Sequence, residues 1–247
     1  MQQDAAATIK RVGLELGGKS AHVILPDADL SAAADAAVGG VMGNSGQTCA
    51  APTRTLIPRE RQAEFLDLIR ERVAALTVGD PRTEVAMGPV VSGAQWRTVQ
   101  SYIEIGVGEG ATLIAGGPGR PDDLPTENAE GWFVRPTVFA DVTNDMRIAS
   151  EEIFGPVMSV IAYDTVDEAV AIANDSPYGL AAYVHGGTPD QVEDVARRLR
   201  AGQVVVNALH PDLTAPFGGY KQSGNGRVWG LQAIEEYLET KAVVGAR

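Results

Sequence analysis

The sequence predicts an α/β protein with a mostly parallel β-sheet and helices on both faces. Short runs rich in β-branched residues alternate with helical stretches along almost the whole chain, and this order is typical of parallel sheets. Each predicted strand is short and apolar enough to be buried on both faces. The predicted strands span residues 22–25, 53–57, 112–115, 157–163, 181–184 and 203–206.

The predicted helices lie between these strands. They span residues 30–41, 59–76, 95–106, 166–173 and 189–199. The second helix shows one stripe of side chains at i, i+3 and i+4 spacing, as expected of a helix packed on a sheet. The stripe consists of Phe65, Leu68, Ile69, Arg72, Val73 and Leu76. Residues 116–131, rich in Gly, Pro and acidic side chains, predict a surface loop within one domain, because strand-like sequence resumes at Phe133.

Both ends of the chain depart from this alternation. Residues 4–10 indicate the end of a helix, and Val12, Leu14 and Leu16 alternate as a strand, but nothing before them completes a βαβ unit. We therefore expect the chain to begin in the middle of a fold. Near the other end the sequence predicts a Gly-rich turn, a helix and a short apolar strand that needs a sheet edge to join. These three segments span residues 217–230, 231–237 and 242–244.

Composition and charge exclude several classes of protein. Hydrophobic residues make up 45% of the 247 residues and charged residues 21%, which is typical of globular domains and excludes a disordered chain. No stretch approaches the roughly 18 apolar residues of a membrane span, and the N-terminus lacks the layout of a signal peptide, so we expect a cytoplasmic protein. The 20 basic and 32 acidic residues give a net charge of -12, which disfavours nucleic-acid and membrane partners because both bind clustered Lys and Arg.

The cysteine and histidine content argues against a metal centre. Cys49 is the only cysteine, which excludes an internal disulfide and a Cys-rich metal site. The three histidines are His22, His185 and His210, and none stands at i, i+4 from another as in metal-binding helices. We therefore expect no metal.

Residues 13–20 (GLELGGKS) match the pattern of a phosphate-binding loop only formally. Such a loop wraps phosphate with backbone amides and runs directly into a helix. Here the interior alternates as a strand and places the Glu15 carboxylate where phosphate would sit, and residues 22–26 are strand-like. The sequence therefore disfavours ATP or GTP hydrolysis.

Cys49 is the first candidate functional residue. It lies in a polar, Gly-containing segment, residues 43–51, between a predicted helix and a predicted strand. A lone cysteine among small residues is most often an inert core residue. The polar residues that flank Cys49 favour another interpretation. In it the thiol is accessible, and its pKa is lowered because it faces backbone amides.

Glu15 is the second candidate, because its carboxyl group stands between Leu14 and Leu16 and just before two glycines. One interpretation is a solvent-facing position on a half-buried edge strand. The other is a carboxyl group in a partly apolar cleft, with a pKa raised into the range of a general base. The residues alone do not choose between the two.

Five segments together resemble those of the aldehyde dehydrogenase family, in order and over essentially the whole chain. They are residues 14–20 (LELGGKS), 46–49 (GQTC), 151–157 (EEIFGPV), 216–224 (PFGGYKQSG) and 237–241 (YLETK). The resemblance implies the α/β fold of that family's catalytic domain. It also implies NAD(P)-dependent oxidation of an aldehyde to a carboxylic acid.

The resemblance assigns roles to five residues. Cys49 is the nucleophile that forms a thiohemiacetal and then a thioester, and Glu15 is the base that activates the hydrolytic water. Glu152 contacts the nicotinamide-side ribose, Phe154 packs near the nicotinamide, and Phe217 lies near the substrate tunnel. Without the resemblance, Glu152 would be interpreted as a charge at a helix end, and the two phenylalanines as core aromatics.

Members of the family are much longer than this chain. The resemblance divides the chain into a remnant of the dinucleotide-binding domain (residues 1–20), a catalytic domain (21–214) and a C-terminal arm (215–247). It implies NAD or NADP bound mostly outside the chain, an aldehyde substrate, and either a homo-oligomer or a complementing N-terminal half. We expect the isolated chain not to oxidise aldehydes by itself. The alternative is a shortened, inactive relative that serves as an assembly or interaction module.

Overall fold

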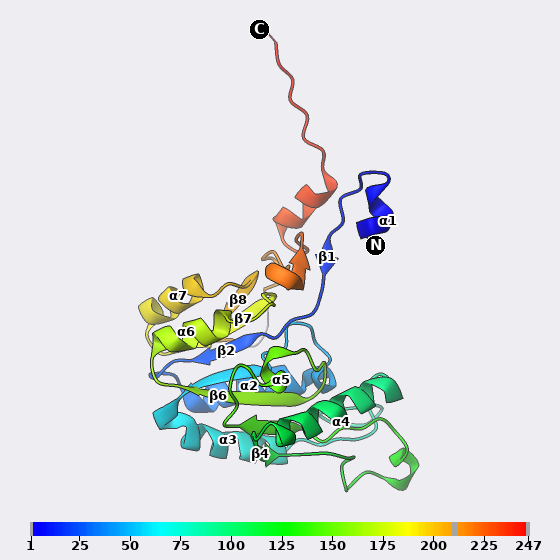
Figure 1. Ribbon diagram of the computed structural model, residues 1–247, viewed down its shortest axis with the longest axis vertical. Coiled ribbons are helices and arrows are strands. Elements are labelled where there is room, and N and C mark those ends of the chain that lie inside the picture. Colours follow the sequence, from blue (N-terminus) through cyan, green and yellow to red (C-terminus); the bar gives the residue numbers. More distant parts are fainter. Residues whose placement is uncertain (1, 209–211, 246–247) are drawn as a thin grey trace.

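A seven-stranded sheet forms the centre of the molecule (Figure 1), with strand order β4-β5-β6-β3-β2-β7-β8. The computed structural model describes residues 2–208 and 212–245. Neighbouring strands are parallel except for β4 and β5, which are antiparallel. The mostly parallel sheet confirms the predicted fold class. The strands are β2 (Ala21–Ile24), β3 (Arg54–Pro58), β4 (Thr112–Ala115), β5 (Thr137–Ala140), β6 (Val157–Tyr163), β7 (Ala181–His185) and β8 (Gln203–Val206).

Helices cover both faces of the sheet, and each face has its own apolar core. Ile24 and Ile57 join the core under α2 and α3, whereas Val23 and Leu56 join the core under α4 to α7. Successive side chains of one strand therefore pack into the cores on opposite faces of the sheet. This explains why these strands are apolar on both faces. The helices are α1 (Gln2–Ala6), α2 (Leu30–Met42), α3 (Gln62–Ala74), α4 (Gly93–Gly108), α5 (Arg147–Ser150), α6 (Val166–Asn174) and α7 (Pro189–Arg198).

Several connections contain short 3-10 helices. They are η1 (Gly43–Gly46), η2 (Arg59–Arg61), η3 (Thr126–Asn128), η4 (Lys221–Ser223) and η5 (Leu231–Tyr237). The helix predicted over residues 59–76 therefore begins as the 3-10 turn η2 and continues as α3. Within the described ranges, no helix has the length and apolar character needed to cross a bilayer.

Capping side chains fix where three helices begin. The Asp29 carboxylate accepts hydrogen bonds from the amides of Ser31 (2.9 Å) and Ala32 (3.2 Å) at the start of α2. Ser92 and Thr165 cap α4 and α6 in the same way. These side chains satisfy amides that have no partner inside the helix.

A second, two-stranded sheet joins a strand near the N-terminus to a strand in the C-terminal segment (Figure 1). Strand β1 (Leu14–Glu15) pairs antiparallel with β9 (Gly224–Asn225). The alternation predicted around Leu14 therefore produces a strand, but one of only two residues.

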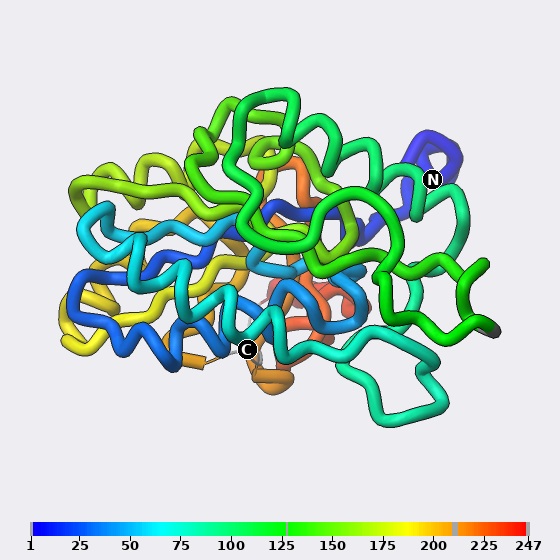
Figure 2. Tube along the Cα trace, turned by 90° about the horizontal axis from the view of Figure 1, so that it is seen from below, coloured from blue at the N-terminus to red at the C-terminus, as the bar shows by residue number. Residues whose placement is uncertain are grey.

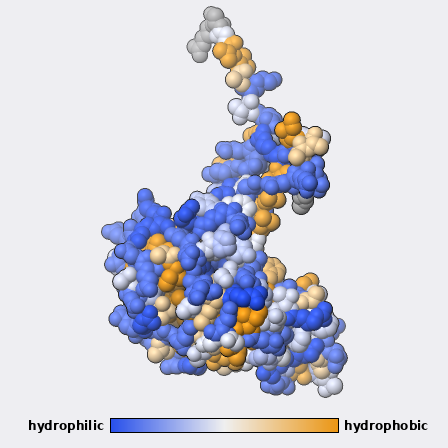
Figure 3. Space-filling model, viewed as in Figure 1, coloured by the Kyte–Doolittle hydropathy of each residue, from blue (hydrophilic) through white to orange (hydrophobic). Residues whose placement is uncertain are grey.

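The last described residues do not form the predicted strand. Residues 242–244 pair with no strand among the residues that the structure describes, and Val243 and Val244 are 92% and 93% exposed. The segment predicted as an ordinary helix before them is the 3-10 helix η5. A short apolar run becomes a strand only where a sheet edge is within reach, and this tail stands clear of the main body with apolar atoms at its surface (Figure 3).

Residues 116–131 form the predicted surface loop, which projects at the periphery of the molecule (green in Figure 2). The Arg120 guanidinium lies over the Trp96 ring, 4.7 Å from its centroid, and 5.8 Å from the centroid of Trp132. Because Trp96 belongs to α4, this stacking anchors the loop to the body of the domain.

A buried histidine pair links β2 to β7. Nε2 of His22 lies 2.8 Å from Nδ1 of His185. Burial lowers the pKa of both rings, and the neighbouring His185 lowers the pKa of His22 further. Both rings are therefore neutral in the folded chain at neutral pH, whereas histidines of an unfolded chain bind protons below about pH 6.5.

We expect the free energy of unfolding to fall as the pH drops below about 6.5, because the unfolded chain then binds protons that the buried pair excludes. Urea unfolding at a series of pH values from about 8 to about 5.5 measures this dependence. A His22→Gln variant removes one of the two titrating rings, so its dependence on pH should be shallower. An equally steep dependence in the variant would assign the acid sensitivity to other groups.

Candidate active site

Four of the five residues singled out by the sequence lie at the edge of the sheet where its parallel strands begin. Cys49 precedes β3, Glu15 lies in β1 before β2, and Glu152 and Phe154 precede β6. Because β6, β3 and β2 are parallel neighbours, the segments that lead into them meet at one edge. The structure thus brings together residues that are far apart in the sequence.

Two glycines pack these segments against one another. The Gly18 amide donates to Oε1 of Glu152 at 3.1 Å. A Cβ on Gly17 would overlap Oε2 of Glu152, and a Cβ on Gly18 would lie 2.7 Å from the carbonyl oxygen of Cys49. The segment that follows Glu15 is therefore held between the carboxylate of Glu152 and the backbone of Cys49.

The turn before Cys49 is fixed by its backbone conformation. Gly46 has φ of 72°, and a Cβ there would overlap the backbone of Gly155. Asn44 and Ser45 are also left-handed, with φ of 51° and 56°, a conformation that costs roughly 1–2 kcal/mol for a residue with a side chain. This tight turn places Cys49 beside the segment that contains Glu152.

Cys49 is half-buried and lines a cavity of about 320 Å³. The lining is mostly apolar and includes Tyr183, Phe217 and Trp229. The ring centroids of Phe217 and Trp229 are 4.7 Å apart. The structure thus places Phe217, proposed from the sequence for the substrate tunnel, in the same cavity as the thiol, although that role stays a prediction.

Burial raises the pKa of the Cys49 thiol above its ordinary value. The amides of Cys49 and Ala50 face the sulfur and favour the thiolate, but their effect is smaller than that of burial, and the negative charges of Glu15 and Glu152 raise the pKa further. The predicted lowering of the thiol pKa is therefore wrong for this structure. The sequence indicates nearby amide donors but not the extent of burial that opposes them.

Glu15 is exposed on the two-residue strand β1 and lines a different cavity, of about 350 Å³, together with Arg227 and Glu236. Partial burial nevertheless raises the pKa of Glu15, and the Arg227 charge opposes that rise. Both interpretations of Glu15 from the sequence thus hold in part. The cavities lined by Glu15 and Cys49 are distinct, and the two residues interact through charge.

Glu152 is half-buried, whereas Phe154 is 39% exposed. Burial raises the pKa of Glu152, while the Gly18 amide and the Lys19 ammonium lower it. Phe154 has φ of 55°, a left-handed conformation that is rare for a bulky residue and is concentrated at functional sites. Phe154 is thus partly exposed and is not a core aromatic residue.

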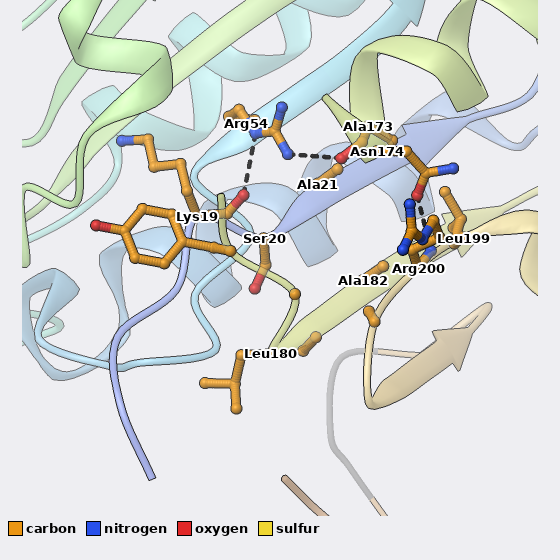
Figure 4. Close-up of a pocket in the computed structure, with 14 residues that line it drawn as sticks. Lys19, Ser20, Ala21, Arg54, Ala173, Asn174, Leu180, Ala182, Leu199 and Arg200 are labelled. Carbon is orange, nitrogen blue, oxygen red and sulfur yellow. Dashed lines mark hydrogen bonds between the residues drawn. The ribbon is translucent and has the colours of Figure 1, made fainter. Parts of the chain in front are cut away.

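Sequence reasoning missed Lys19. Its side chain is 2% exposed, and its ammonium has no hydrogen-bond partner among the described residues. Burial, reinforced by the Arg54 charge, lowers the pKa of Lys19 to about 7, and attraction to Glu152 opposes this. The Lys19 and Ser20 side chains point in different directions, although both residues line the cavity shown in Figure 4.

The Gly-Lys-Ser pattern therefore marks a buried amine and not a phosphate loop. Strand β2, and not a helix, follows it, as the sequence indicated. Residues 2–208 and 212–245 contain no group of three or more His, Cys, Asp or Glu side chains arranged to hold a metal ion. His210 lies outside the described residues.

Comparisons with known proteins agree with the motifs. The model of the aldehyde dehydrogenase family matches residues 1–243. An aldehyde dehydrogenase relative from Staphylococcus haemolyticus is 50% identical over 248 residues. The match covers 99% of this chain and 51% of the relative. Aldehyde dehydrogenase C from Pseudomonas syringae, a cysteine-to-alanine variant crystallised with NAD+ and octanal, is 51% identical with a TM-score of 0.94, and the match covers 98% of this chain and 50% of that one.

An NAD+ complex of an aldehyde dehydrogenase from Bacillus cereus is 44% identical with a TM-score of 0.90, and the match covers 98% of this chain and 48% of that one. The chain thus spans about half the length of the curated relatives it matches. The family model covers nearly the whole chain, and the sheet and helices of this chain superpose on the two solved structures with TM-scores of 0.94 and 0.90. The chain belongs to the aldehyde dehydrogenase family.

Proposed function

We propose that this chain supplies the nucleophile and the base for NAD(P)-dependent oxidation of an aldehyde to a carboxylic acid. The observation that carries the proposal is the meeting of the Cys49, Glu15 and Glu152 segments at one sheet edge, held by the contacts of Gly17 and Gly18. Family membership supports aldehyde oxidation in general. The Pseudomonas syringae complex with octanal supports an aldehyde with an apolar chain, which suits the mostly apolar cavity beside Cys49.

Cys49 would act as the nucleophile. Its thiolate adds to the aldehyde carbon, the C–S bond forms as the C=O π bond breaks, and the former carbonyl oxygen carries the negative charge in the tetrahedral thiohemiacetal. The Cys49 amide, which faces the sulfur, would donate to this oxygen and stabilise it. Loss of hydride from the same carbon leaves a thioester on Cys49.

Glu152 and Phe154 fit the nicotinamide half of the cofactor. Ribose hydroxyls need a hydrogen-bond acceptor, which the carboxylate of Glu152 would supply, and the partly exposed Phe154 ring would offer a flat apolar surface to the nicotinamide. When bound, the nicotinamide supplies the hydride acceptor.

Glu15 would act in the last step. It removes a proton from a water molecule, the resulting hydroxide attacks the thioester carbon, the C–S bond breaks, and the carboxylic acid leaves with the Cys49 thiol regenerated. The partial burial that raises the pKa of Glu15 makes it a better base than an ordinary surface glutamate.

We further propose that residues 1–20 belong to a dinucleotide-binding domain, 21–214 to the catalytic domain and 215–247 to a C-terminal arm. Side chains of this arm are strongly exposed, with Tyr237 at 84% and Val244 at 93%. Apolar surface of this kind favours a partner, either a second copy or the half present in the longer relatives. The same observation favours the second candidate function, an inactive assembly module.

The test combines the chain with the separately produced N-terminal half of a full-length relative, NAD+ and octanal. We expect nicotinamide absorbance to rise only when both halves are present, whereas Cys49 reacts with iodoacetamide in the chain alone. No rise with both halves present, together with a thiol that iodoacetamide does not modify, would contradict the oxidation and favour the assembly module.

A further inference from the structure

Both oxygens of the Glu152 carboxylate contact the backbone of another segment of the protein, the Gly17–Gly18 link. Oε1 accepts the hydrogen bond from the Gly18 amide at 3.1 Å. Oε2 occupies the space that a Cβ on Gly17 would need. A carboxylate that only contacts a cofactor does not require a glycine against its other oxygen, so the fit at Gly17 indicates a second role within the protein.

The Gly17–Gly18 link connects Glu15 to the body of the catalytic domain. On one side, Glu15 is held by the two-residue pairing of β1 with β9, by the Leu14 amide, which donates to Asn225 Oδ1 at 3.0 Å, and by the Leu16 amide, which donates to the Ser223 carbonyl at 3.1 Å. These partners belong to the C-terminal turn. On the other side, the hydrogen bond from the Gly18 amide to Glu152 connects the link to the segment before β6.

The same link lies against the candidate nucleophile. A Cβ on Gly18 would lie 2.7 Å from the Cys49 carbonyl oxygen and 3.3 Å from Cβ of Leu180. A displacement of the Gly17–Gly18 link would therefore shift Glu15 relative to Cys49. On its other side the link is held by the Glu152 carboxylate and, one residue further along, by Arg54, whose Nε donates to the Lys19 carbonyl at 3.0 Å; the Glu152 carboxylate is the contact to the Gly18 amide itself.

Lys19 supports this arrangement. Its buried ammonium follows Gly18 directly in the chain and has no hydrogen-bond partner among the described residues. Burial raises the pKa of Glu152, and the Lys19 charge partly offsets this rise and favours the ionised carboxylate. An ionised acceptor binds an amide more strongly than a neutral one.

We infer that Glu152 is a positioning residue for Glu15, because its carboxylate, bonded to Gly18, holds the Gly17–Gly18 link against Cys49. The inference rests on the proposed function, since it concerns the step in which Glu15 activates water. It adds to the proposed contact of Glu152 with the cofactor, and it operates without the cofactor.

The first test measures hydrogen exchange of the Gly18 amide by NMR on the full chain. In a Glu152→Ala variant we expect this exchange to accelerate at least about tenfold, because a hydrogen bond to a charged acceptor is lost. In a Glu152→Gln variant most of the protection should return, since the side-chain amide oxygen also accepts a hydrogen bond. Glu151→Ala is the matched control, because the Glu151 carboxylate bonds Tyr102 (2.6 Å) and Arg147 instead.

The second test measures the two steps of p-nitrophenyl acetate cleavage, which needs no cofactor. Cys49 takes the acetyl group as a thioester while p-nitrophenolate leaves, and water then releases acetate. The ratio of the deacylation rate to the acylation rate should fall about tenfold to a hundredfold in Glu152→Ala, as expected when a reacting group is misplaced, and should recover largely in Glu152→Gln. On top of Glu15→Gln, Glu152→Ala should add little further loss, because both changes affect one group.

Three results would overturn the inference. They are Gly18 exchange in Glu152→Ala equal to that in Glu151→Ala, faster exchange without a fall in the rate ratio, and a full additional loss on top of Glu15→Gln. A chain that takes up no acetyl group at Cys49 contradicts the proposed function instead, and the exchange data alone then decide whether Glu152 holds the link.

Discussion

Replacement of Cys49 by alanine is expected to abolish acyl transfer from p-nitrophenyl acetate. In the unmodified chain the thiolate attacks the ester carbon, the bond to p-nitrophenolate breaks, and the acetyl group stays on sulfur. Because Cys49 is the only cysteine, no other thiol can replace it, and we expect the acylation rate to fall by more than about a thousandfold. A burst of one p-nitrophenolate per chain measures the step, and mass spectrometry locates the acetyl group.

A Cys49→Ser variant separates chemistry from packing, because the hydroxyl fills nearly the same space but is a much weaker nucleophile. It should also lose the burst. In the unmodified chain, acylation should accelerate as the pH rises through the alkaline range, since burial and the charges of Glu15 and Glu152 raise the pKa of the thiol. A burst that persists in Cys49→Ala, with acetyl on another side chain, would place the nucleophile elsewhere.

Six of the seven strands of the central sheet were predictable, because each carries a local signal of short, apolar, β-branched sequence. Residues 157–163 are apolar on both faces, and the predicted strand matches β6 (Val157–Tyr163). The predicted strands omit β5 (Thr137–Ala140), because strand-like sequence resumes at Phe133 whereas the strand begins only at Thr137, directly after Pro136. Proline has no backbone N–H to donate to a ladder, so pairing begins after it.

The tail shows where local signals fail. Residues 242–244 have the composition of a strand, yet they pair with no strand in the described part of the chain. Strand formation depends on a partner edge, which the sequence of one segment cannot supply. The two-residue strand β1 does form, because the turn around Gly224 places a pairing partner, β9, beside it.

The candidate site was predictable in its members but not in its geometry. The sequence motifs identify Cys49 and Glu152 as candidates. Only the strand order β6-β3-β2 of the folded chain explains why the two residues lie close together. The sequence also could not show that the Lys19 ammonium is buried without a hydrogen-bond partner in the part of the chain that the structure describes. Burial is a sum over many distant contacts, and pKa shifts follow burial.

Replacement of Glu15 by glutamine is expected to slow hydrolysis of the acetyl thioester on Cys49 by about 10²–10⁴-fold. Glutamine keeps the size of the side chain but cannot take a proton from water, so the p-nitrophenolate burst should persist while the steady-state rate falls. Burial raises the pKa of Glu15, so its basic form is lost at a higher pH than for an ordinary glutamate, whose pKa is about 4.3. Hydrolysis in the unmodified chain should therefore fall as the pH drops through that raised pKa, and this acid limb should disappear in Glu15→Gln.

Glu236→Gln is the matched control, because Glu236 lines the same cavity as Glu15. Its hydrolysis rate should stay close to that of the unmodified chain, with the acid limb retained. If Glu15→Gln also hydrolysed the thioester at the unmodified rate, the base would be another group. Since Glu15 and Cys49 line distinct cavities, that result would mean that water reaches the thioester through the cavity of Phe217 and Trp229 without passing Glu15.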